Sequence, residues 1–122
     1  MGKLSDKIME TIAEIRPGII ATSSKDGRPN VSAKGSFRVL DDEHVVFADI
    51  SSPRTIANLR ENPQVSILVV HPKSMKGCRI WGRGEILDSG EIFDQMSKEF
   101  AERNLKVNHV VKIIVEEAQD SF

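Results

Sequence analysis

Short strand-like segments joined by tight turns constrain this fold more than any other feature of the sequence. The first two are separated by the stretch KDGRP, whose Asp26-Gly27 pair is typical of a β-hairpin turn. Strands joined so closely pair antiparallel, because a parallel connection needs a much longer crossover. About six such segments occur, at residues 18–24, 30–40, 45–50, 65–70, 78–87 and 109–118. We therefore predict a mainly β fold of the α+β class, with an antiparallel sheet that can close into a small barrel.

Helical spacing marks the segments that should flank this sheet. Residues 4–15 repeat apolar side chains at helical intervals, and Pro17 should end that helix. A short helix is expected over residues 53–62, where the Asn62-Pro63 pair stops it. A longer helix should follow Asp88 and Glu91, which have the spacing of a capping box.

Length, charge and cysteine content narrow the function classes. The 122 residues predict a single domain, residues 1–122. Eighteen acidic and seventeen basic residues give a net charge of −1, which argues against a nucleic-acid partner bound through bulk charge. No apolar run approaches the roughly 20 residues of a membrane span, and the first residues lack the apolar stretch of a signal peptide. With Cys78 as the one cysteine, we expect a cytoplasmic protein without a membrane partner.

The turn before the short helix, SSPRT at residues 51–55, collects hydroxyl groups and a cation. Ser52 suits the N-cap, and Pro53 loses nothing at the first helical position because that position has no intrahelical N–H partner. The free N–H groups that follow, together with the helix dipole, form an anion site. Arg54 adds a guanidinium suited to phosphate, and Thr55 adds a hydroxyl. An ordinary capped helix with a solvated arginine would give the same pattern, so this stretch alone leaves both readings open.

Two strand patterns also carry polar faces. Ser32, Lys34, Ser36 and Arg38 alternate along residues 30–40, and a later strand aligns two arginines with Trp81. The solvent side of an antiparallel sheet alternates in the same way. Together with the SSPRT turn, however, three segments offer cations and hydroxyls in a chain without general basicity. A small polyanionic ligand with a flat aromatic group would account for all three.

The segments PNVSAK, VVFADISSPRTIANLRENPQVSILVV and RIWGRGEI resemble the FMN-binding split-barrel family of pyridoxamine 5′-phosphate oxidase and small bacterial FMN-binding proteins. The resemblance covers roughly residues 19–87 and implies a six-stranded antiparallel split β-barrel with flanking helices. It also implies FMN as the cofactor, bound at a homodimer interface. Thr55 stands where the oxidase has a second cation, which is similar to the small FMN-binding proteins.

Candidate cofactor-binding residues follow from this resemblance. The strand that lines the flavin ring corresponds to residues 30–34, and the pair that contacts the flavin or its ribityl chain corresponds to Ala48 and Asp49. Phosphate binding falls to the start of the short helix. The candidate residues are Asn30, Val31, Ser32, Lys34, Ala48, Asp49, Ser52, Arg54 and Thr55. Lys34 and Arg79 are both candidates for a cation that stabilises the reduced, anionic flavin.

Other chemistries are less well supported by the residues. His44, His71 and His109 are scattered without a carboxylate at ligand spacing, so no metal site is predicted. No catalytic residues can be assigned from spacing, which fits a protein whose cofactor does the redox chemistry. The main hypothesis is a flavoprotein that acts as an oxidoreductase or electron carrier. The alternatives are a deazaflavin- or haem-linked split-barrel enzyme and a nucleotide-binding module without turnover.

Overall fold

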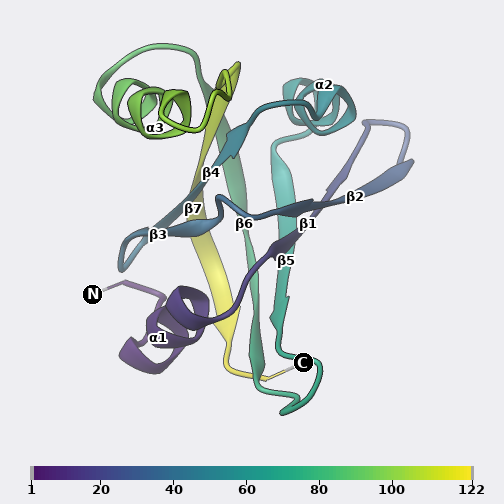
Figure 1. The fold of residues 1–122 in the computed structure, drawn as a ribbon. Helices are drawn as coiled ribbons and strands as arrows, with labels where there is room; N and C mark the ends of the chain where they lie inside the picture. The colour runs from purple at the N-terminus through teal and green to yellow at the C-terminus, as the bar shows by residue number, and fades with distance from the viewer. Residues whose placement is uncertain (1, 122) are drawn as a thin grey trace.

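A computed structural model of the protein describes residues 2–121 (Figure 1). The described chain forms three helices and seven strands. In chain order these are α1 (Asp6–Glu14), β1 (Gly18–Ser23), β2 (Pro29–Lys34), β3 (Arg38–Asp41), β4 (His44–Asp49), α2 (Pro53–Glu61), β5 (Gln64–Val70), β6 (Gly77–Leu87), α3 (Glu91–Ala101) and β7 (His109–Gln119). None of the helices in this part of the chain is long and apolar enough to cross a membrane.

All strands belong to one antiparallel sheet with the order β2-β1-β5-β6-β7-β4-β3. The two edge strands, β2 and β3, are consecutive in the chain, so their short connection draws the two edges of the sheet toward each other. The result is a half-barrel, and the predicted fold class is confirmed. The hairpin between β1 and β2 turns at Gly27, whose φ of 90° lies in the region that favours glycine.

The seventh strand arises where one long strand was expected. Residues 30–40 break at Gly35, and the Phe37 N–H donates to the Lys34 carbonyl oxygen across a tight turn (3.2 Å). The turn changes which way the side chains point, so Phe37 is buried in the core. The predicted shared face of Ser32, Lys34, Ser36 and Arg38 is therefore wrong beyond Lys34.

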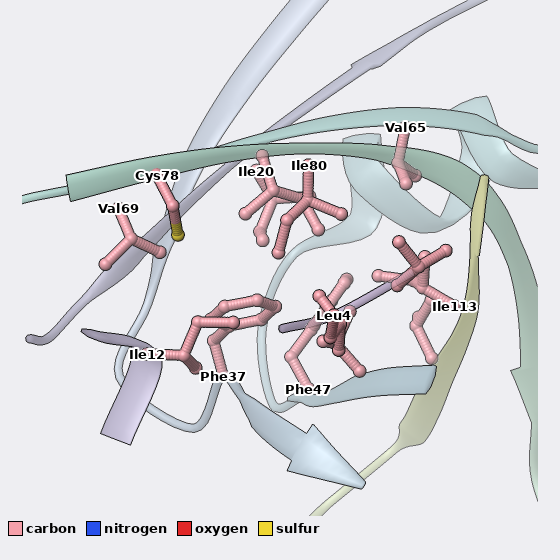
Figure 2. Close-up of a cluster of buried hydrophobic side chains, with 14 of the residues drawn as sticks. Leu4, Ile12, Ile20, Phe37, Phe47, Val65, Val69, Cys78, Ile80 and Ile113 are labelled. Carbon is pink, nitrogen blue, oxygen red and sulfur yellow. The ribbon is translucent and has the colours of Figure 1, made fainter. Parts of the chain in front are cut away.

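The core fills the inside of the curled sheet (Figure 2). Phe37 and Phe47 lie in the middle of this cluster, which apolar side chains from α1 and from the facing strands complete. A second cluster packs α3 against β4 and β7 through Met96 and Phe100. Strand β4 serves both clusters, because Phe47 points into the barrel while Ala48 packs under α3.

Two glycines affect the pairing of β6 with β7 and the start of α3. Gly82 lies at an irregularity in the pairing of β6 with β7, and a Cβ there would come within 2.2 Å of the Ile114 carbonyl oxygen. Gly90 precedes α3 with a φ of 99°, and no side chain caps the helix. The predicted capping box of Asp88 and Glu91 is therefore wrong, because α3 begins only at Glu91.

Candidate functional site

Strand β2 turns its polar side chains inward and its apolar side chains outward. Asn30, Ser32 and Lys34 are half-buried, whereas Ala33 is exposed and Val31 is 63% exposed. A strand at the edge of a barrel normally does the reverse. The polar face must therefore meet polar partners, and it meets them at the start of α2.

Three hydrogen bonds join β2 to the first turn of α2. The Asn30 side-chain amide donates to the Thr55 hydroxyl (3.4 Å), and the Ser32 hydroxyl bonds the same oxygen (3.2 Å). The Lys34 ammonium donates to the Ser52 hydroxyl at 2.6 Å. Thr55 is only 1% exposed, so its hydroxyl is a fixed, buried link between the strand and the helix.

Asp49, the last residue of β4, holds the turn that leads into α2. Its carboxylate accepts from the Ser52 backbone N–H (2.8 Å) and from the Ser52 hydroxyl (2.5 Å). Ser52 and Pro53 occupy the N-cap and first helical positions as predicted, but the Ser52 hydroxyl donates to Asp49 instead of capping the helix. No side chain caps α2, so its first N–H groups stay available to an anion.

The charges at this junction balance each other. Burial lowers the pKa of Lys34, and the nearby Asp49 carboxylate opposes that shift. Burial raises the pKa of Asp49, but hydrogen bonds from Ser52 and His109 outweigh it and bring the pKa below its usual value. The His109 Nδ1 lies 2.8 Å from the second Asp49 oxygen. The Lys34 ammonium also lies 5.8 Å from the centre of the Phe47 ring.

Three hollows surround the start of α2. The Arg54 hollow, about 190 Å³, is lined by Ser24, Arg28, Pro29, Asn30, Arg54, Ala57 and Asn58. The Lys34 hollow, about 280 Å³, lies between the β2–β3 turn and α3 and includes Lys34, Ala48 and Ser51. The Arg60 pocket, about 580 Å³, lies between α2 and the start of β7 and includes Asp49, Ser52, Arg60 and His109.

The structure brings together every predicted site residue except Val31, whose side chain points away on the outer face of β2. The remaining predicted residues line one of the hollows or join the hydrogen bonds between them: Asn30, Ser32, Lys34, Ala48, Asp49, Ser52, Arg54 and Thr55. Arg54 is exposed on the first turn of α2.

Three polar residues that the sequence also singles out, Ser36, Arg38 and Arg79, have structural partners outside this junction. The buried Ser36 hydroxyl accepts from the Ala48 N–H at 2.9 Å and so holds the end of β4. Arg38 forms a two-pronged ion pair with Glu99, at 2.8 Å for each bond. Arg79, the alternative cation for the flavin, bonds Gln119 at 2.6 Å and does not reach the hollows around α2 in this chain.

Arg60 and His109 were missed in the sequence. His109 lies opposite Asp49 in the pairing of β4 with β7, and only the order of the strands in the sheet, which the sequence patterns do not predict, could have indicated that contact. No cluster of histidine, cysteine or acidic residues within residues 2–121 could hold a metal ion. Cys78 is buried in the core, and burial raises its pKa to about 11.

Comparison with known proteins agrees with this fold. The family model described as pyridoxamine 5′-phosphate oxidase matches residues 4–121. The chain belongs to the pyridoxamine 5′-phosphate oxidase-like FMN-binding split-barrel family. It is also 36% identical over 103 residues to the uncharacterized protein MJ0282 of Methanocaldococcus jannaschii, covering 79% of this chain and 68% of that protein.

Solved structures of this fold superpose closely on the chain. A histidine-to-alanine variant of HupZ from Group A Streptococcus has a TM-score of 0.86 at 24% identity, over 95% of this chain and 98% of that chain. An FMN-binding protein from Syntrophomonas wolfei has a TM-score of 0.83 at 20% identity, over 93% and 83%. HutZ, the haem storage protein from Vibrio cholerae, has a TM-score of 0.70 at 24% identity, over 97% and 94%. At these identities the likeness supports the split-barrel fold and leaves the ligand of this chain open.

Proposed function

We propose that this protein binds FMN and acts as an oxidoreductase or electron carrier. The observation that carries the proposal is the convergence of the inward polar face of β2 on the uncapped first turn of α2. Free N–H groups, the Arg54 guanidinium and the Thr55 hydroxyl offer a phosphate several donors at once. The family match and the Syntrophomonas wolfei relative add support for a flavin.

Other predicted site residues suit the ring and the ribityl chain of FMN. Residues 30–34 would lie along the flavin ring, and Ala48 and Asp49 would lie near the ring or the ribityl chain, as in the family. When bound, FMN would supply electron transfer, and the chain would supply position and charge. Lys34 is held by Ser52 beside the predicted ring position, so we assign it, rather than Arg79, as the cation that favours the reduced flavin.

We also propose that the protein is a homodimer. The pairing of β2, β1, β5 and β6 aligns Val31, Ala21, Ser66 and Trp81 in one row across the sheet. The row lies on the outer face, because Val31 is exposed and directly paired residues share a face. A second copy packed on this face would cover that apolar surface.

Titration of the purified protein with FMN tests the function, with flavin fluorescence as the readout. Because a charge-assisted hydrogen bond contributes about 1.5–3 kcal/mol, Arg54→Gln should weaken FMN binding by roughly 10- to 100-fold. Riboflavin, which lacks the phosphate, should bind weakly and should not distinguish Arg54→Gln from the natural protein. Lys98→Gln, which removes an exposed cation from α3, is the matched control and should bind FMN normally.

The alternatives give different results in the same experiment. Tight binding of deazaflavin or haem with weak binding of FMN would replace the proposal with a different cofactor. FMN binding without turnover when reduced nicotinamide and an electron acceptor are added would favour a nucleotide-binding module. Solution mass with and without FMN tests the homodimer, and a monomer under both conditions would contradict it.

A further inference from the structure

The Arg60 pocket and the Arg54 hollow lie on different sides of α2, with Ala57 lining both. Arg54 and Arg60 are six residues apart on this helix, so they point in different directions and line different spaces. At about 580 Å³, the pocket falls within the range of small-molecule sites. The pocket shares Asp49 and Ser52 with the proposed FMN site, but Arg60, Asn108 and His109 are not part of that site and need another explanation.

The walls of this pocket are held in place. The Asn108 N–H donates to the Asp49 carbonyl oxygen at 2.9 Å, and the Asn108 side-chain amide donates to the Ile50 carbonyl oxygen at 2.8 Å. These bonds tie the chain before β7 to the end of β4. The apolar part of the lining comes from Ile50, Pro53, Ile56 and Ala57. The site is therefore built largely in advance of any ligand.

The open end of the pocket carries the positive charge of Arg60, which has no acidic partner among residues 2–121. Arg60 is exposed, and its nearest polar partner is the His109 Nε2, at 3.5 Å from Nη2. In the tautomer whose Nδ1–H donates to Asp49, Nε2 is free to accept from the guanidinium. Histidine thus steadies Arg60 without neutralising it.

We propose that the Arg60 pocket binds a small organic carboxylate with an apolar body. One guanidinium is suited to one carboxylate through a two-pronged contact, and the four apolar side chains suit a short hydrocarbon or aromatic ring. Asp49 is 3% exposed and ionised at the pocket floor, where Ser52 and His109 take up its hydrogen bonds. One guanidinium without a carboxylate partner balances a single negative charge, so a monoanion is favoured over a doubly charged anion.

The test uses benzoate as the probe, with benzamide and acetate as comparisons. Benzamide keeps the ring without the charge, and acetate keeps the charge without the ring. We expect saturable benzoate binding with a Kd on the order of 1 mM, and binding at least about tenfold weaker for both comparisons. Amide shifts in 1H–15N spectra should move for residues 50–60 and 108–109, which locates the probe in this pocket.

Paired variants separate this inference from the proposed function. Arg60→Gln should weaken benzoate binding by about tenfold or more and leave FMN binding in place, whereas Arg54→Gln should do the reverse. Both side chains are exposed, and unchanged thermal melting would confirm that each variant is folded. Benzamide binding equal to benzoate, acetate binding equal to benzoate, or benzoate binding unaffected by Arg60→Gln would overturn the inference. None of these results depends on whether FMN binds.

Discussion

Replacing Asp49 with asparagine should destabilise the protein by removing one buried negative charge. The carboxylate accepts from the Ser52 N–H at 2.8 Å, from the Ser52 hydroxyl at 2.5 Å and from the His109 Nδ1 at 2.8 Å. It also attracts the Lys34 ammonium. Asparagine has almost the same shape, so Asp49→Asn tests the charge without leaving a cavity.

The size of the effect follows from these bonds. Hydrogen bonds to a charged group contribute about 1.5–3 kcal/mol, and neutral ones about 0.5–1.5 kcal/mol. Asparagine can still accept from Ser52, but it presents N–H groups in place of the charged oxygen that lies 2.8 Å from the His109 Nδ1. Loss of the charge assistance, together with the weakened His109 contact, should lower the free energy of unfolding by about 2–4 kcal/mol at pH 7.

The sign of the pH dependence can be worked out from the same carboxylate. The pKa of Asp49 is lower in the folded protein than in the unfolded chain, so the folded protein favours the ionised form. This contribution to stability is complete above the unfolded pKa of about 4 and is lost as the pH falls through the folded pKa. The difference between the natural protein and Asp49→Asn should therefore shrink from pH 5 toward pH 2.

Urea unfolding followed by the fluorescence of Trp81, the only tryptophan, measures both effects. Asp120→Asn is the matched control, because Asp120 forms an exposed pair with Lys7 at 3.4 Å and should cost no more than about 1 kcal/mol. An unfolding free energy within about 0.5 kcal/mol of the natural protein at pH 7 would refute the reasoning. So would a stability difference that stays constant between pH 7 and pH 3.

Three further predictions concern the core and the proposed cofactor. Gly82→Ala should lower the free energy of unfolding in urea by about 1–3 kcal/mol, because the new Cβ would meet the backbone of β7. Gly35→Ala is the control, because Gly35 has open space around it, and it should change that free energy by no more than about 0.5 kcal/mol. Equal losses for the two variants would contradict this packing. Cys78 should resist iodoacetamide at pH 8 in the folded protein and react after unfolding, which mass spectrometry can follow. Rapid labelling of the folded protein would show that Cys78 is not buried. Lys34→Met should lower the midpoint potential of bound FMN by about 30 mV, while Arg79→Met should not change it; identical shifts would remove the assignment of Lys34.

The features that sequence reasoning found are local ones. The SSPRT turn carries the N-cap position, the proline, the arginine and the threonine within a few residues. Alternation along residues 29–34 indicates which side chains of β2 share a face. Hairpins and antiparallel pairing follow from short turns such as the one at Gly27. These signals were enough to predict the class of fold and to indicate where α2 begins.

The features that were missed depend on backbone geometry or on distant pairing. Residues 30–40 look like one strand, because nothing in their alternation marks the turn at Gly35 that sends Phe37 into the core. Asp88 and Glu91 have capping-box spacing, but the positive φ of Gly90 sets the start of α3 instead. The contact of Asp49 with His109 joins residues that are 60 positions apart, and it exists only because β4 pairs with β7.

The bonds of Asp49 and Lys34 to Ser52 explain why α2 has an open first turn. A serine at the N-cap would normally bond a helix N–H and stabilise the helix by about 0.5–2 kcal/mol. Here Asp49 takes the Ser52 hydroxyl as a donor, and Lys34 donates to the same oxygen, so that stabilisation is replaced by bonds outside the helix. The serine is held in position while the helix N–H groups are left without a side-chain partner. A fixed turn with unsatisfied donors and an adjacent arginine is what phosphate recognition requires, because an anion can bind there without any rearrangement of the chain.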